Sequence, residues 1–243
     1  MKVAVISDIH GNRLALEAVL DDIAQHKVDA IFNLGDMVSG PLEPNWVVDI
    51  LMDIDIPTVR GNHERELIEK TPEQMYDVDR FVQAQMEARH RGWINALPPS
   101  LAILDDLFLC HGTPTSDSDP WLDGWWEGRT STSPDEASVA AKAEGFDYPV
   151  LLCGHTHIPR AVRLRDGRLI VNPGSVGLQF NHGSPDARYA TIELREGRYY
   201  ASFHAVPYDH FAAARLAEAN GFPHWRDALV TGWASPAGLF SRK

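Results

Sequence analysis

Five short polar motifs occur along the chain, and each directly follows a short run of apolar residues. In chain order they are Asp8-Ile9-His10, Gly35-Asp36, Gly61-Asn62-His63-Glu64, His111-Gly112 and Gly154-His155-Thr156-His157. An apolar run of about four to eight residues is typical of a buried strand. Between the first runs apolar residues recur at helical spacing, so strands and helices alternate. This alternation predicts a parallel sheet with helices on its faces, whose strands carry the motifs to one edge.

The first half of the chain is expected to supply this parallel section. Strands are predicted at residues 3–6, 30–34 and 57–60, and helices at 13–26 and 46–54. Asn12 is the expected N-cap of the first helix. Residues 64–97 are predicted to be helical until Pro98-Pro99 ends this section, because proline cannot continue a helix.

The second half of the chain has a different pattern, in which strands come in pairs around short turns. The predicted pairs are 101–104 with 107–110, 162–165 with 169–171, and 189–194 with 199–205. The turn Asp166-Gly167 is the strongest hairpin signal of the three. Hairpins that follow a parallel section indicate an α/β fold in which two sheets pack on each other, rather than one open sheet.

We expect residues 1–207 to form one domain and residues 208–243 to form a C-terminal helical appendage. A helix of roughly ten residues is predicted after Asp209, and the last dozen residues are expected to be loosely ordered. Phe222, Trp225 and Trp233 could pack on the same chain or on a neighbouring copy. The sequence therefore leaves the oligomeric state open.

Composition narrows the possible partners. The formal net charge of −12 disfavours nonspecific binding to nucleic acid or to an anionic membrane, since both are polyanions. An anionic substrate remains possible, because bound divalent cations reverse the field locally. No apolar run approaches the roughly 20 residues that span a bilayer, and Asp8 interrupts the N-terminal run, which is too short for a signal peptide. A cytoplasmic location is expected.

The first two motifs contain candidate metal ligands. Asp8 and His10 are one residue apart, and in extended backbone such side chains point the same way, so both could reach one ion. Asp36 follows the second strand and could lie beside Asp8, since neighbouring parallel strands end side by side. Its two carboxylate oxygens could bridge two cations. Taken alone, each motif is also compatible with an ordinary surface turn.

The remaining motifs add nitrogen and amide ligands. The Asn62 amide oxygen is an acceptable ligand, His63 could ligate or donate a proton, and Glu64 could equally be a helix N-terminal acid. His155 and His157 could project to one side after their strand. Mixed nitrogen and oxygen ligands favour Mn, Fe, Zn, Co or Ni over Mg or Ca, and the lack of thiolate ligands favours a catalytic site. Cys110 and Cys153 read as buried strand residues.

The complete ordered pattern, DxH, GD, GNH(D/E), H and GHxH, resembles the calcineurin-like metallophosphoesterases over about residues 3–177. The N-terminal residues 7–12 are most similar to those of small bacterial and archaeal phosphodiesterase-like members, and Asn172-Pro173-Gly174-Ser175 resembles the turn that closes their core. The resemblance implies two mixed β-sheets packed as a sandwich flanked by helices. It also implies a centre of two divalent transition-metal ions.

The resemblance assigns a role to each motif residue. Seven side chains would bind metal: the first ion at Asp8, His10 and His157, the second at Asn62, His111 and His155, and both at Asp36. His63 would protonate the leaving oxygen or stabilise the transition state without being a ligand. Two cations roughly 3.5–4 Å apart would hold a bridging water and present it as hydroxide to the phosphorus.

The implied activity is hydrolysis of a phosphodiester or phosphomonoester of a small molecule or nucleotide. Two alternatives remain, a phosphoprotein phosphatase and a non-catalytic scaffold that keeps the fold. The aromatic segment 121–126, which contains Trp121, Trp125 and Trp126, could cover the site and stack on a base or aryl group. The alternative, which the sequence favours, is that these tryptophans pack a long loop onto the core.

Overall fold

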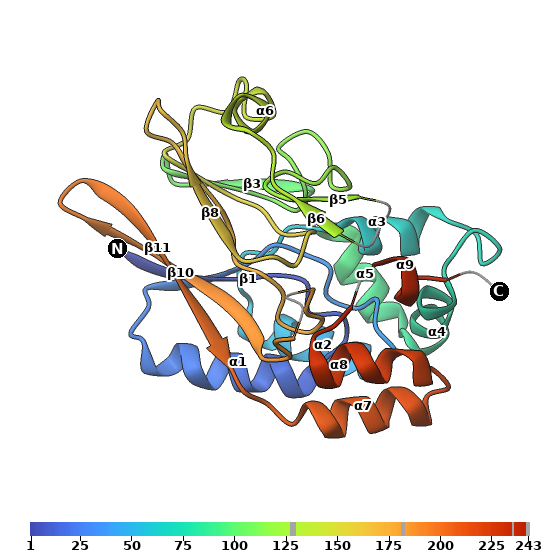
Figure 1. The fold of residues 1–243 in the computed structure, drawn as a ribbon. Coiled ribbons are helices and arrows are strands. Elements are labelled where there is room, and N and C mark those ends of the chain that lie inside the picture. The colour runs from blue at the N-terminus through green and yellow to red at the C-terminus, as the bar shows by residue number, and fades with distance from the viewer. Residues whose placement is uncertain (127–129, 181–182, 235, 242–243) are drawn as a thin grey trace.

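The computed structural model describes residues 1–126, 130–180, 183–234 and 236–241, and shows two sheets packed face to face with helices outside them (Figure 1). The first sheet has the order β11-β10-β1-β2, in which β1 and β2 are parallel and the other pairs antiparallel. Its strands are β1 (Lys2–Ile6), β2 (Ala30–Asn33), β10 (Ala187–Arg195) and β11 (Arg198–Val206).

The second sheet has the order β3-β4-β7-β9-β8, with three parallel central strands and an antiparallel strand at each edge. Its strands are β3 (Ser100–Ile103), β4 (Leu107–Cys110), β7 (Val150–Leu152), β8 (Arg160–Arg163) and β9 (Leu169–Asn172). Two further strands, β5 (Gly124–Trp126) and β6 (Thr130–Thr132), form a small separate sheet. The predicted sandwich of two mixed sheets and its three hairpins are confirmed.

Strand β1 shows why the core runs of this chain are apolar throughout. Val3 and Val5 face the second sheet, in a cluster with Leu109, whereas Ala4 and Ile6 face the helices. A strand buried on both faces needs apolar residues at every position, so alternation disappears.

The helices of the first two-thirds of the chain lie outside the two sheets (Figure 1). They are α1 (Arg13–Gln25), α2 (Pro44–Ile54), α3 (Asn62–Glu69), α4 (Asp77–Gln85), α5 (Ala88–Ala96) and α6 (Glu136–Ala141). The Asn12 side chain accepts a hydrogen bond from the Ala15 N–H at 3.2 Å, which confirms it as the N-cap of α1.

Two predicted elements differ from the structure. The predicted strand at 57–60 is a single parallel bridge between Asn33 and Thr58, because Pro57 has no N–H to extend the ladder. The helical stretch 64–97 is three separate helices, α3 to α5. Pro72 lies in the first of the two gaps, where it cannot continue a helix.

The C-terminal residues form α7 (His210–Ala219), a 3₁₀ turn η1 (Pro223–Trp225), α8 (Arg226–Thr231) and α9 (Pro236–Leu239), shown in red in Figure 1. The predicted helix after Asp209 is confirmed, and Trp225 is fully buried, whereas Trp233 is 61% exposed. Near the end of the described residues, Leu239 is packed in an apolar cluster at 5% exposure. Among the described helices, none has the length and apolarity needed to cross a membrane.

Candidate metal centre

Six of the seven predicted ligands gather into two groups at the ends of β1, β2, β4 and β7. Within each group the ligand atoms lie within 4.8 Å of one another. The first group is Asp8, His10 and His157, and the second is Asp36, His111 and His155. The seventh predicted ligand, Asn62, starts α3, and its buried Oδ1 has no hydrogen-bond partner among the described residues.

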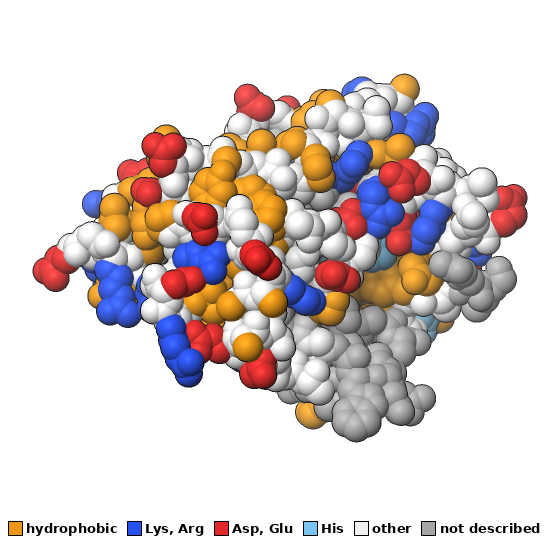
Figure 2. Space-filling model, turned by 90° about the horizontal axis from the view of Figure 1, so that it is seen from above, with side chains coloured by type: hydrophobic (Ala, Val, Ile, Leu, Met, Phe, Trp, Pro, Cys, Tyr) orange, Lys and Arg blue, Asp and Glu red, His pale blue; other side chains and the backbone are white. Residues whose placement is uncertain are grey.

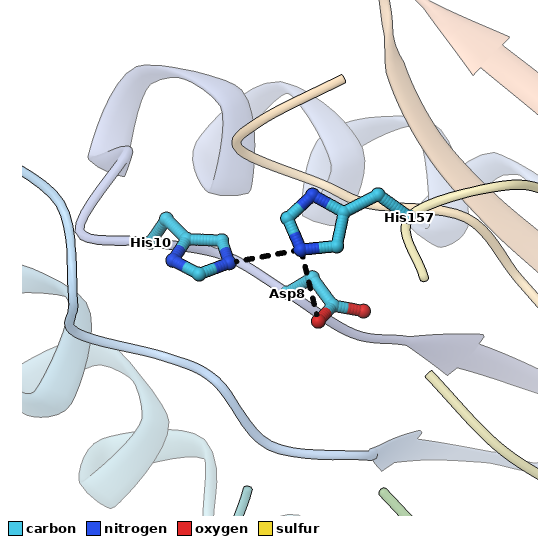
Figure 3. A group of neighbouring side chains, drawn as sticks. All are labelled: Asp8, His10 and His157. Carbon is cyan, nitrogen blue, oxygen red and sulfur yellow. Dashed lines mark hydrogen bonds and ion pairs between the residues drawn. The ribbon is translucent and has the colours of Figure 1, made fainter. Parts of the chain in front are cut away.

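The first group has its ligand atoms turned toward one point (Figure 3). The Nε2 atoms of His10 and His157 are 3.1 Å apart, and His157 Nε2 is 3.4 Å from Asp8 Oδ1. On the other side of each ring, Nδ1 lies close to a backbone carbonyl, at 2.7 Å from Ser39 O for His10 and 2.6 Å from Leu178 O for His157.

These contacts fix where the protons are. A carbonyl oxygen only accepts, so each ring carries its proton on Nδ1, and the lone pairs of the two Nε2 atoms face each other. Two lone pairs and a carboxylate oxygen in contact repel one another unless a proton or a metal cation lies between them. Nitrogen ligands that are about 2.0–2.1 Å from one tetrahedral ion are roughly 3.3 Å apart, so the observed spacing fits a metal ion.

The second group repeats this arrangement. His111 Nδ1 donates to Leu34 O at 2.7 Å, and its Nε2 lies 3.0 Å from Asp36 Oδ2. That buried Nε2 makes no hydrogen bond within the described chain, in the same way as Asn62 Oδ1. Orientation of metal-binding histidines by a partner on the second nitrogen is a general feature of metal sites.

The pKa shifts of four ligand groups favour the forms that bind metal, whereas His111 differs: burial lowers its pKa, but Asp36 outweighs burial and raises that pKa to about 10, so a metal ion there would displace a proton. Burial opposes ionisation of both carboxyls, but the neighbouring histidines hold the pKa of Asp8 below, and that of Asp36 well below, its ordinary value. Burial lowers the pKa of His10 to about 3 and that of His155 to about 4. Ionised carboxylates and neutral imidazoles are the forms that bind metal.

The backbone at five of the seven predicted ligands adopts the left-handed conformation. The φ angles are +56° at Asp8, +49° at His10, +53° at Asp36, +69° at His155 and +61° at His157. The expectation that extended backbone aims Asp8 and His10 alike is therefore wrong, and a left-handed turn brings them together. A non-glycine residue in a sparsely populated conformation costs about 1–3 kcal/mol, and such residues cluster at functional sites.

Two motif glycines allow the aspartates to sit where they do. A Cβ at Gly61 would lie 2.2 Å from Asp36 Oδ1, and a Cβ at Gly154 would lie 2.1 Å from Ser7 Oγ and 2.8 Å from Asp8 Oδ2. Any side chain at either position would displace a carboxylate. This contact explains why glycine precedes the motif histidines in both places.

Glu64 supports the centre without belonging to either group of ligands. Its buried carboxylate accepts from the backbone N–H groups of Asp36, Met37 and Gly61 at 2.8, 2.7 and 3.1 Å. It therefore fastens the loop after β2 to the start of α3, which extends the predicted role as a helix N-terminal acid. Burial, together with the charge of Asp36, raises the pKa of Glu64 to about 7.

His63 lies beside the ligands and has a partner that the sequence reasoning missed. Its Nδ1 is 3.5 Å from Oδ1 of Asp79, a fully buried residue of α4. Burial lowers the pKa of His63, but Asp36 and Asp79 outweigh it and raise the pKa to about 9. Asp79 shares the buried face of α4 with Val78 and Val82, and a carboxylate on an apolar helix face was the signal available in the sequence.

The structure describes the side chain of one of the three tryptophans in the aromatic segment 121–126. Trp121 is buried in the cluster outside the second sheet and donates its Nε1–H to Val139 O at 3.0 Å. For Trp121 the packing alternative is therefore confirmed. The side chains of Trp125 and Trp126, on which the covering alternative also depends, lie outside the described part of the structure.

The chain belongs to the calcineurin-like phosphoesterase superfamily, since the sequence model of that superfamily's domain matches residues 1–197. This family is metal-dependent, and membership supports a hydrolase that acts on phosphate esters. The two groups of side chains described above supply the ligand clusters that such a protein requires.

Two relatives match nearly the whole chain. A metallophosphoesterase from Sphaerobacter thermophilus is 26% identical with a TM-score of 0.78, over 94% of this chain and 98% of the relative. Uncharacterized protein MJ0912 from Methanocaldococcus jannaschii is 26% identical over 243 residues, which are 92% of this chain and 94% of the relative. A candidate diadenosine tetraphosphatase shares the fold at 18% identity and a TM-score of 0.51, over 83% of this chain and 93% of its own.

Proposed function

We propose that the chain is a dinuclear metal-dependent phosphoesterase that hydrolyses a phosphodiester or phosphomonoester of a small molecule or nucleotide. The observation that carries this proposal is the pair of Nε2 lone pairs of His10 and His157, which face each other 3.1 Å apart beside a carboxylate. A metal cation shared by these three atoms would relieve their repulsion. The expected surroundings are cytoplasmic, where the small-molecule ester would be the partner.

The predicted ligands fit two divalent transition-metal ions, from Mn, Fe, Zn, Co and Ni. Asp8, His10 and His157 would hold one ion, Asn62, His111 and His155 the other, and Asp36 both. When bound, such ions activate a water and neutralise the phosphate oxygens. Glu64 and the two motif glycines would keep the aspartates in place while the ions bind.

His63 would supply the proton that the leaving oxygen needs. Its Nδ1 faces Asp79, so Nε2 is the nitrogen left to face the substrate. The backbone N–H of His63 donates to Asp36 Oδ1 at 3.0 Å, which fixes the start of α3 against the metal centre. A positioned general acid contributes about 10²–10⁴-fold in rate.

The test is hydrolysis of bis(p-nitrophenyl) phosphate and of p-nitrophenyl phosphate after chelation, and again after adding Mn, Fe, Co, Ni, Zn or Mg. We expect the transition metals to restore activity, and the diester-to-monoester ratio to define the substrate class. Asp22→Asn is a control variant that should keep the metal-restored activity, because Asp22 lies on α1, outside both groups of predicted ligands. Phosphopeptide turnover in preference to both esters would favour a phosphoprotein phosphatase, and full metal binding without hydrolysis would favour a scaffold.

A further inference from the structure

The C-terminal segment, residues 236–241, packs against the proposed acid of the metal centre. Both neighbours of Phe240 are held: Leu239 is buried in the apolar cluster around Trp225, and Ser241 is bonded to α4. The Ser241 carbonyl accepts from the Asp77 N–H at 2.9 Å, and its hydroxyl donates to Asp77 Oδ2 at 3.4 Å. These contacts fix the backbone on both sides of the Phe240 side chain.

The Phe240 ring contacts the site directly. Its centroid is 4.7 Å from the His63 ring at an interplanar angle of 33°, and 5.9 Å from the His10 ring. Tyr76 adds a second aromatic ring, 5.8 Å from Phe240 and 6.4 Å from His63. The side of the centre that carries His63 therefore presents two aromatic rings, Phe240 and Tyr76, beside the His63–Asp79 pair.

The opposite part of the centre is more open. His10 is 1% exposed and His63 7% exposed, whereas His155 of the second group is half-buried. Figure 2 shows histidine at the surface in a hollow, next to hydrophobic side chains and below a rim of charged ones. A phosphate ester would thus meet the open, charged part with its phosphate and the aromatic side with its leaving group.

We propose that Phe240, supported by Tyr76, is a specificity-determining residue that contacts the leaving group and favours esters whose leaving group carries a flat aromatic ring. The inference rests on the proposed function, because it uses His63 as the acid. An oxygen that takes a proton from His63 lies within hydrogen-bond reach of that ring. The group attached to this oxygen then meets the face or edge of Phe240, which favours another aromatic ring.

Phe240 lies outside the part of the chain that the superfamily model matches. The superfamily domain matches residues 1–197, so this ring comes from beyond the region that carries the metal-binding motifs. The motif residues would perform the hydrolysis, and the C-terminal segment would select among the esters offered to them. This division places substrate choice in the C-terminal segment and the reaction itself in the two-sheet core.

The experiment compares two leaving alcohols of similar acidity, phenol and hexafluoroisopropanol, attached to the same phosphoryl group. Both compounds are diesters or both are monoesters, according to the class that the wild-type protein hydrolyses. In the full chain, Phe240→Ala should lower the phenyl-to-hexafluoroisopropyl ratio of kcat/KM by about 3–10-fold, the range of one aromatic contact, while Phe240→Tyr should retain it. Phe211→Ala removes a 51% exposed phenylalanine of α7 and is the matched control, with no change expected.

A second readout needs neither metal nor turnover. In the metal-free chain, the His63 ring protons should change NMR chemical shift in Phe240→Ala, since the ring current of Phe240 is lost, and should not change in Phe211→Ala. Equal effects of Phe240→Ala on both esters, or unmoved His63 signals, would overturn the inference. An unchanged chain that hydrolyses no ester with any metal would instead overturn the proposed function, and the NMR result would still report the contact.

Discussion

The metal centre and a cluster on the outer side of the first sheet, here called the surface cluster, both bring aspartate and histidine side chains close together. Asp22, His26 and His204 also place three ligand atoms within 4.8 Å of one another. In this cluster, however, each group is already paired: His26 Nε2 lies 3.3 Å from Asp22, which accepts the Tyr189 hydroxyl at 2.6 Å. His204 Nε2 pairs with the hydroxyl of Thr191 at 3.1 Å.

The histidines of the metal centre differ from those of the surface cluster in how they are oriented. Backbone carbonyls hold the Nδ1–H groups of His10, His111 and His157, and leave each buried Nε2 directed at another ligand, a carboxylate for His111 and His157 and His157 itself for His10. The surface cluster has no such orienting carbonyls among its described contacts and is only half-buried. Proximity alone is thus a weak sign of a metal site, whereas oriented, unsatisfied ligand atoms are a strong one.

Removal of the Asp36 carboxylate should give the largest difference in activity and metal content between variants of the metal centre and of the surface cluster. Asp36→Ala should release both ions and lower hydrolysis by more than about 10³-fold, since the cations supply several kcal/mol of transition-state stabilisation. Metal content by mass spectrometry and turnover of bis(p-nitrophenyl) phosphate measure this. Asp22→Ala should leave both unchanged, and a loss of metal there would erase the contrast.

Removing the acid should spare the metals. His63→Ala should keep the metal content and lower kcat by about 10²–10⁴-fold. Because the pKa of His63 is raised to about 9, the ring is protonated below that pH, and wild-type kcat should fall as the pH rises through it. The pH profile of the variant should lack this alkaline decline. Metal loss in parallel with activity would show that His63 is a ligand instead.

Removing the partner of the acid should have a smaller effect. Asp79→Asn should lower kcat by about 10–100-fold, the usual effect of removing a group that orients another. The carboxylate of Asp79 raises the pKa of His63, so its loss should also move the alkaline decline to lower pH. An unchanged decline would mean that the 3.5 Å contact does not act on the proton.

The smallest effect is expected in the surface cluster. His204 stacks on Tyr189 across β10 and β11, with centroids 4.4 Å apart. His204→Ala should therefore lower the free energy of unfolding by about 0.2–1 kcal/mol, the value of one cross-strand pair. Metal content and turnover should not change. Urea unfolding and metal analysis together decide this, and a lower metal content would give the cluster a binding role.

The sequence predicted the parts that depend on local pattern. Apolar runs located the strands, and the residues after them located both groups of ligands. It did not predict the left-handed backbone at Asp8 and His10, because no local rule places a non-glycine residue there. Asp79 and Phe240 were missed for another reason, since each reaches His63 from a helix or segment distant in the chain. Contacts of that kind arise from tertiary packing alone.

Anomalous diffraction from crystals of the metal-reloaded chain tests the central claim most directly. Data collected at the absorption edge of the added Mn or Zn would locate each ion without assumptions about ligands. We predict two peaks, one among Asp8, His10 and His157 and one beside His111 and His155, with Asp36 between them. A single peak, or a peak only at Asp22, His26 and His204, would contradict the two-metal centre.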